Sequence, residues 1–194
     1  FGMYGSNSKN YGDGFTTMYG ANHEDIAYSY RTGNHGDGSW YSINGNIDYQ
    51  RTSRKNKQRM ITFSYKINTQ PQTSNSNTGY EDIHAKEEVD DLVKRLLLKN
   101  SQSDGKTNTM EQTFQVDYTT PIGELHTVEA GAKYIFRCNT SDNKLYEAAG
   151  GSDDYLYNED RSSDYRHLNH ILAAYLGYTL KYKDFTFKPG VRYE

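Results

Sequence analysis

The residues from Ser39 to Asn68 decide the fold, and they read SWYSINGNIDYQRT, SRKNKQ and RMITFSYKIN. Apolar or small side chains occupy every second position from Tyr41 to Tyr49, with polar side chains between them. The same alternation resumes at Ile61, after a short polar turn. A period of two places successive side chains on opposite faces of a β-strand. The stretch therefore predicts a long antiparallel hairpin with one apolar and one polar face.

The alternation returns twice more along the chain. It predicts three strand hairpins, over 39–69, 110–138 and 168–194. The turns inside these hairpins are short and fall at 53–57, 121–124 and 183–184. The segments between hairpins, 70–109 and 140–166, are long and polar.

The remaining segments carry little alternation. Residues 1–38 are rich in Gly, Asn, Ser and Tyr, and we expect them to be mostly loop. The connection 70–109 begins as flexible polar sequence and continues with apolar residues at the spacing of an amphipathic helix. These residues are Val89, Leu92, Val93, Leu96 and Leu97.

Short turns at one end and long loops at the other are typical of transmembrane β-barrels. The expected fold class is therefore all-β: an antiparallel transmembrane β-barrel segment with about six clear strands and up to eight. The whole chain, 1–194, is expected to form part of one such barrel domain. A soluble antiparallel sheet with one solvated face is the alternative, and the loop asymmetry argues against it.

The two faces of the predicted strands differ in charge. Over these strands the apolar face carries no Asp, Glu, Lys or Arg, as expected of a surface in hydrocarbon, where a central Arg or Lys costs about 2–4 kcal/mol. The polar face is expected to line the barrel lumen. Its charged residues are Asp48, Lys66, Glu111, Asp117, Glu129, Lys133, Arg137, Lys181, Lys188 and Arg192.

The composition excludes several classes of protein. The net charge of −3 gives no sign of a nucleic-acid partner, and the single cysteine, Cys138, allows no internal disulfide. Only 34% of the residues are hydrophobic, yet 19 are Tyr, which separates the chain from disordered sequences. No apolar run is long enough for a transmembrane helix.

Three segments resemble one family. They are SINGNIDYQRTSRKNKQRMITFSYK, QTFQVDYTTPIGELHTVEAGAKYIFRCNTSD and HILAAYLGYTLKYKDFTFKPGVRYE. Within them, the motifs DYTTP and EAGAKY, and the later AAY and GVRYE, carry the likeness. In these features the chain resembles the barrel region of the TonB-dependent receptor superfamily, in the outer membrane protein β-barrel branch common in Bacteroidetes-type bacteria.

The resemblance implies a protein of the bacterial outer membrane that imports a nutrient. Family members have barrels of about 22 strands whose lumen is filled by a plug domain. The implied partners are outer-membrane lipid, the plug domain of the parent chain, TonB through a missing N-terminal region, and an unidentified nutrient. The chain begins at Phe1 and shows no plug or TonB-binding box, so we expect it to be an internal fragment of a longer protein.

No catalytic, cofactor-binding or metal-binding residues are expected, and the protein is not expected to be an enzyme. His167 and His170 lie at a strand start, where positions three apart face opposite sides. The adjacent His23, Glu24 and Asp25 are expected to be solvated, and the acidic residues between 153 and 160 lack the spacing of a calcium loop. The aromatic candidates for ligand contact in loops are Trp40, Tyr80 and Tyr155.

Two other functions remain open from the residues alone. One is a small outer-membrane barrel or an adhesin that acts through its loops. The other is a soluble β-sheet domain that binds carbohydrate through exposed Tyr and Trp side chains.

Overall fold

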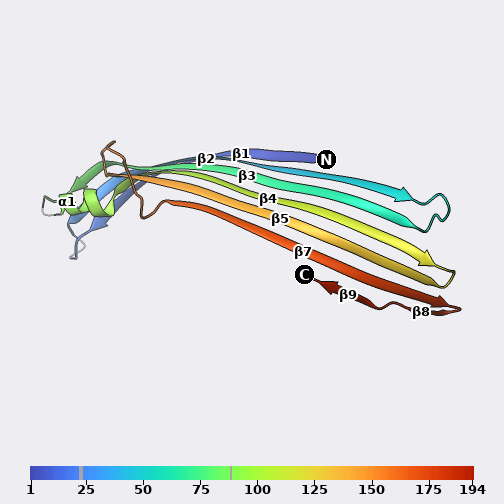
Figure 1. Cartoon of the computed structure of the whole chain (residues 1–194). Coiled ribbons are helices and arrows are strands. Elements are labelled where there is room, and N and C mark those ends of the chain that lie inside the picture. Colours follow the sequence, from blue (N-terminus) through green and yellow to red (C-terminus); the bar gives the residue numbers. More distant parts are fainter. Residues whose placement is uncertain (22–23, 88) are drawn as a thin grey trace.

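The computed structural model describes residues 1–21, 24–87 and 89–194 and consists of one curved antiparallel sheet (Figure 1). Most strands are long. They are β1 (Gly2–Tyr19), β2 (Ile26–Thr52), β3 (Met60–Ala85), β4 (Lys99–Ile122), β5 (His126–Ala149), β6 (Leu156–Tyr157), β7 (Ser163–Tyr182), β8 (Phe185–Phe187) and β9 (Gly190–Tyr193). The expected antiparallel all-β fold is confirmed, and the described residues form nine strands instead of six to eight.

The strands follow the order β1-β2-β3-β4-β5-β7-β8, with β6 paired to β5 and β9 paired to β7. The hairpin turns β2–β3, β4–β5 and β7–β8 lie together at one end, and α1 (Asp90–Leu92) lies at the other (Figure 1). The sheet is open, with β1 at one edge and the β8 and β9 strands at the other.

The expectation that residues 1–38 are mostly loop is wrong. They form β1 and the first part of β2, which pair in register from Gly2 opposite Asn44 to Tyr19 opposite Ile26. Gly, Asn and Ser on both faces left no period-two signal there. A strand with both faces in water needs no alternating apolar residues, because its backbone hydrogen bonds hold it in the sheet.

The expectation that 70–109 and 140–166 are long polar loops is wrong for the same reason. β3 continues to Ala85 and β4 begins at Lys99, so most of 70–109 is paired strand. In the same way, β5 runs to Ala149 and β7 begins at Ser163 within the expected loop 140–166. We call these paired parts, beyond the apolar residues and away from the hairpin turns, the extension.

The expected amphipathic helix is reduced to a short helical turn. It consists of α1 and a π-helical turn, η1 (Val93–Leu97). The side chains of Leu96 and Leu97 lie outside the described residues. Val93 and Leu98 are buried, so the turn packs one apolar side against the end of the sheet. No helix in the part of the chain that the structure describes is long and apolar enough to cross a membrane.

The strand register gathers the apolar residues into one continuous band, which we call the apolar belt. A cross-strand row at its middle contains Ile47, Tyr65, Phe114, Tyr134 and Leu172. The belt consists of alternate residues of 41–49 on β2, 61–67 on β3, 110–122 on β4, 126–138 on β5 and 168–180 on β7. None of them is Asp, Glu, Lys or Arg. A tilted strand crosses hydrocarbon with about 9–11 residues, close to the 7 to 13 residues that the belt spans on each strand.

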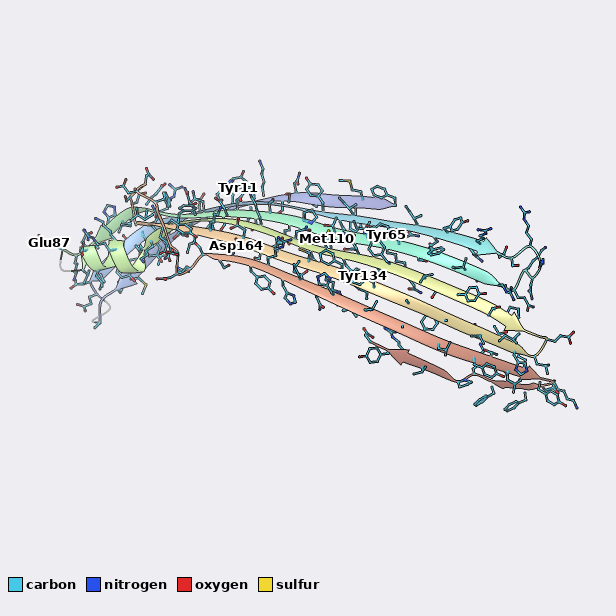
Figure 2. The ribbon with its side chains drawn as sticks, in the orientation of Figure 1. Tyr11, Tyr65, Glu87, Met110, Tyr134 and Asp164 are labelled. Atoms are coloured by element: carbon cyan, nitrogen blue, oxygen red, sulfur yellow. The ribbon has the colours of Figure 1, made fainter. Side chains whose placement is uncertain are left out.

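Charge returns to the apolar face within four residues of the end of the belt on β4, β5 and β7. Figure 2 shows Met110, Tyr65 and Tyr134 in the belt, and Asp164 nearer the α1 end. Lys106 lies opposite Asp142, and Asp142 lies opposite Asp164, all on the face that carries Met110. The absence of charge on this face therefore holds over the belt alone. The first charged rows mark the boundary of the belt on the side of α1.

The two faces of the belt give a direct test. Ile47 is 70% exposed on the apolar face, whereas its neighbour Asn46 donates a hydrogen bond to Asp48 on the polar face. We expect Ile47→Arg to lower the free energy of unfolding in a lipid bilayer by about 2–4 kcal/mol, because it places a charge in hydrocarbon. Asn46→Arg is the matched control and should cost far less. Equal costs in a denaturant titration would show that the faces are assigned wrongly.

Candidate functional site

The polar face of the belt carries the charged residues that the sequence pattern singled out. The strand register places nine of the ten on this one face, opposite the apolar belt. The tenth, Lys188, lies in the link between β8 and β9. Arg137 pairs with Glu111 on the neighbouring strand, with 2.6 Å between Nε and Oε2. The face is therefore a surface of mixed charge, and Arg137 and Glu111 form a cross-strand pair on it.

One tyrosine bridges three strands of the polar face. The Tyr175 hydroxyl on β7 donates a hydrogen bond to Asp117 Oδ1 on β4 at 2.5 Å. Its ring crosses β5 above Gly131, where any Cβ would overlap the ring. Glycine at 131 therefore lets the ring lie flat against the sheet, and Tyr175 covers backbone that the small residue leaves bare.

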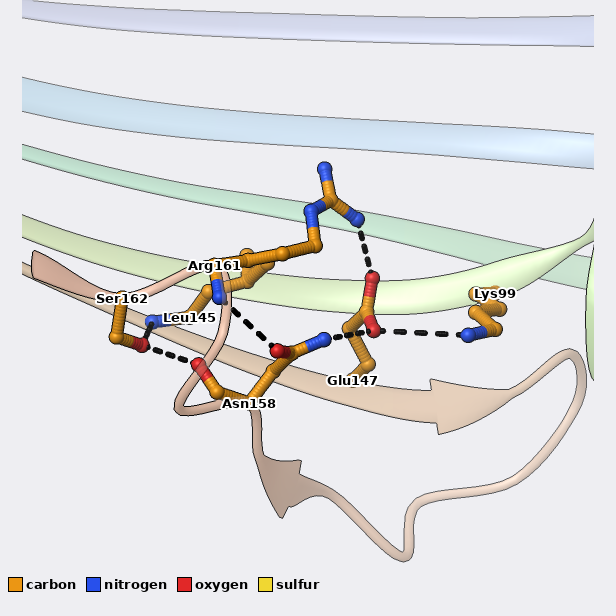
Figure 3. A network of polar contacts seen from close by, with 6 residues as sticks. All are labelled: Lys99, Leu145, Glu147, Asn158, Arg161 and Ser162. Carbon is orange, nitrogen blue, oxygen red and sulfur yellow. Dashed lines mark hydrogen bonds and ion pairs between the residues drawn. The ribbon is translucent and has the colours of Figure 1, made fainter.

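The extension holds a second polar cluster, centred on Glu147 of β5 (Figure 3). Glu147 Oε1 lies 2.5 Å from Arg161 Nη1, and Glu147 Oε2 accepts a hydrogen bond from Asn158 Nδ2 at 2.7 Å. Lys99 Nζ on β4 lies 3.6 Å from the same Oε2. Only 12% of the Glu147 side chain is exposed. This carboxylate therefore ties the segment between β6 and β7 to two strands.

Hydrogen bonding from Asn158, together with the nearby charges of Lys99 and Arg161, holds the pKa of Glu147 below its ordinary value, against the opposing effect of burial. Asn158 is fixed in turn, since its backbone N–H donates to Leu145 O at 2.8 Å and its own carbonyl accepts from Ser162 Oγ at 2.6 Å. The ionised form of Glu147 is the form that holds the cluster together.

Asn100 organises the end of the sheet next to α1. Its side chain is buried, and Oδ1 accepts a hydrogen bond from the Tyr80 N–H at 2.8 Å while Nδ2 donates to Ser152 O at 3.0 Å. Gly151, with φ of +75°, donates its N–H to Tyr80 O at 3.1 Å. The segment after β5 thus takes over the pairing of β3 where the β3–β4 ladder stops.

The three aromatic candidates for ligand contact do not come together. Tyr80 and Tyr155 line one hollow of about 630 Å³, together with Asn100. Trp40 lines a different hollow and meets Tyr4 edge-on, with ring centroids 5.7 Å apart. Burial, and then the charge of Asp153, raises the pKa of Tyr155, while a hydrogen bond with Gln102 opposes the shift.

Several residues of this region could not be predicted from the sequence. Tyr11 and His35 line the same hollow as Tyr155, yet both fall in the segment expected to be loop. Their rings lie 4.6 Å apart because β1 and β2 pair there. Isolated aromatic residues in a Gly- and Asn-rich run were the one available signal. Glu147 and Arg161 gave no such signal, because charged residues in a segment expected to be loop are expected to be exposed to solvent.

The structure places the possible metal ligands apart. His170 accompanies Tyr134 on the apolar face, with 2.7 Å between Nδ1 and the hydroxyl, whereas His167 lies on the polar face. Within the described residues, no three His, Cys, Asp or Glu side chains gather closely enough to hold a metal ion. His23 lies outside the described residues.

Glu147 predicts a pH dependence for the segment that it holds. A carboxyl group whose pKa is lowered on folding stabilises the fold above its ordinary pKa, and this stabilisation is lost as pH falls through the folded pKa. We expect the protection factors of the amides in 150–162, corrected for the intrinsic pH dependence of hydrogen exchange, to fall as the pH falls below about 4.5. Glu147→Gln should weaken the segment at pH 7 by about 1–2 kcal/mol, less than a fully buried charged pair because Arg161 is largely exposed.

The matched control for Glu147 is Glu159→Gln, an exposed carboxyl group in the same segment. It should leave exchange in 150–162 unchanged at pH 7. If Glu147→Gln exchanges like the wild type across the whole pH range, the cluster does not hold the segment.

The comparisons with known proteins agree with this geometry. The model of the "outer membrane protein beta-barrel family" matches residues 52–194. No curated protein matches the chain. The matched region contains most of the apolar belt and its charged opposite face. The chain belongs to the outer membrane protein β-barrel family, and its location is the bacterial outer membrane.

Proposed function

We propose that the chain is part of the barrel of a TonB-dependent receptor that imports a scarce nutrient across the outer membrane. The observation that carries the proposal is the polar face of the belt, which bears cations and anions over its whole height, including Asp48, Lys133 and Arg137. A lumen packed with apolar side chains would not take these charges, whereas a lumen that holds water or a polar plug would.

The two open edges support a large barrel. Backbone N–H and C=O groups in hydrocarbon cost several kcal/mol each when they stay unpaired, so both edges require further strands. We propose that the parent chain supplies these strands and a plug domain, with TonB delivering the energy for uptake. Large plugged barrels of outer-membrane transporters provide the analogy. A small barrel or an adhesin, closed by copies of this chain, is the competing arrangement.

A photo-crosslinking amino acid can test what fills the barrel. Placed at Lys133, it faces the polar side of the belt, and placed at Ala132 it faces the apolar side. In intact cells we expect position 133 to crosslink to a folded polypeptide segment and position 132 to crosslink to lipid. If position 133 captures no polypeptide in correctly folded protein, the plug is refuted.

Uptake can be tested with a panel of radiolabelled probes: cobalamin, a ferric catecholate complex and maltoheptaose. We expect accumulation of one of them to fall by at least tenfold both in cells lacking the protein and in cells lacking TonB. Normal uptake of all three in both strains, together with no polypeptide crosslink at position 133, would favour the adhesin.

The extension is proposed to stand outside the cell and the hairpin turns in the periplasm. In a Cys138→Ser background, Ser76→Cys should react with a membrane-impermeant thiol reagent on intact cells. Lys55→Cys, in the turn after β2, should react only after the outer membrane is opened. The reverse pattern of labelling would show that the sheet has the opposite orientation in the membrane.

A further inference from the structure

One cross-strand row in the extension has an unusual composition. On six neighbouring strands, successive partners in register lie side by side on the face that carries the apolar belt. We call it the outer row, and its residues are Tyr11, His35, Asn77, Gln102, Tyr146 and Tyr157. It contains no carboxylate, ammonium or guanidinium group, although the extension around it is rich in them.

The row has an aromatic pair at each end and amides in the middle. Tyr11 and His35 have ring centroids 4.6 Å apart, and Tyr146 and Tyr157 have ring centroids 5.5 Å apart. Asn77 and Gln102 lie between the pairs and supply both donors and acceptors of hydrogen bonds. Strands spaced about 4.8 Å apart make a row across six strands about 24 Å long.

The charges nearest the row on the hairpin side compensate one another. In the neighbouring row, Lys9 lies opposite Asp37 and Asp104 lies opposite Lys144, so the charges of that row sum to zero. Asn75 lies between the two pairs and donates a hydrogen bond to Asp37 at 3.2 Å. A phosphate-rich polymer would meet no excess of positive charge here, and the outer row itself offers none.

The row also borders a concave surface. Tyr11, His35 and Asn77 line a hollow of about 630 Å³, which Tyr155 from the segment after β5 also lines. The carboxylates of Asp13, Glu81 and Asp153 lie in the same hollow, on the side of the row nearer α1, and they add no positive charge. Tyr155 hydrogen-bonds Gln102 within the row. The exposed Tyr11 side chain, 72% accessible, leaves its ring free to contact a ligand.

We propose that the outer row is a binding surface for an uncharged polysaccharide that runs across the strands. The flat faces of aromatic rings pack against the C–H faces of sugar rings, and the amides and phenols hydrogen-bond sugar hydroxyls. The regular spacing of the row across the strands suits a polymer with a repeating unit. This inference goes beyond the proposed uptake function, because the row lies on the face opposite the charged surface of the belt.

The position of the row is one that a saccharide can reach from two sources. Gln102 lies eight residues beyond Met110, the last belt residue of β4, or about 27 Å along the strand. The row therefore stands on the outside wall of the barrel, above the hydrocarbon. The saccharide part of an outer-leaflet glycolipid reaches that height, and a free glycan in the medium offers the same chemistry.

The test uses the intact protein in nanodiscs and two kinds of probe. The free-glycan probes are fluorescently labelled maltohexaose, cellohexaose and chitohexaose, measured by equilibrium binding. The membrane probes are a glycolipid with a neutral hexasaccharide and the same lipid without its saccharide, measured by retention during purification. Binding of the hexaoses identifies a free glycan, and selective retention of the full-saccharide lipid identifies the membrane source.

The variants are Tyr11→Ala and Tyr146→Ala, singly and together. Each should weaken saccharide binding about 3- to 10-fold, with a larger loss in the double variant. Tyr165→Ala is the matched control, because Tyr165 is as exposed as Tyr157 (53% and 52%) but lies on the opposite face. Gln102→Ala tests the amides without removing a ring, and it should also weaken binding.

The proposal is overturned if neither kind of probe binds the wild-type protein. It is equally overturned if Tyr165→Ala weakens binding as much as Tyr11→Ala, or if heparin competes as well as the neutral hexaoses. Uptake of the transported probe should remain normal in the Tyr11 and Tyr146 variants. Saccharide binding by the wild-type protein, without TonB-dependent uptake of any probe, would count against the proposed transport function and leave this surface in place.

Discussion

The structure depends on the pairing of backbone hydrogen-bonding groups. The long strands are joined edge to edge in continuous antiparallel ladders, whereas among the described residues only six apolar side chains are buried, Pro121 included. A single layer with so little core cannot be stabilised as a soluble domain is, by burying one apolar face against another. In hydrocarbon, backbone pairing contributes more to stability than apolar burial within the protein. An unpaired backbone group is costly there, and the apolar belt needs no protein partner.

The belt could be predicted from the sequence and the extension could not, and the reason is physical. In the belt, one face meets lipid and the other meets polar surroundings, so neighbouring residues such as Ile47 and Asn46 must differ in polarity. In the extension both faces meet water, and residues such as Ser76 and Asn77 satisfy either face equally well. Period two therefore vanishes at the point where the solvent becomes the same on both sides, although the strands continue.

The same reasoning explains what the sequence revealed about the polar sites. The charged residues of the belt, such as Asp117 and Lys133, stand out because charge alternates with apolar residues. The cluster around Glu147 depends on a fold of the chain that brings Asn158 and Arg161 back over β5, and no local pattern encodes that return. The outer row depends on register across six strands, and residues 1–38, which supply two of its members, were expected to be loop.

Pairing throughout the extension restricts which changes in length the protein can accept. An ordinary surface loop often accepts the gain or loss of one or several residues. In a paired strand, one added residue turns every side chain beyond it to the other face. The register shifts of β1–β2 and β2–β3 occur near Tyr19 and Ser29, beyond the outer row, where few paired residues follow. Between the belt and the outer row, related chains should therefore differ in length by two residues at a time, matched on neighbouring strands.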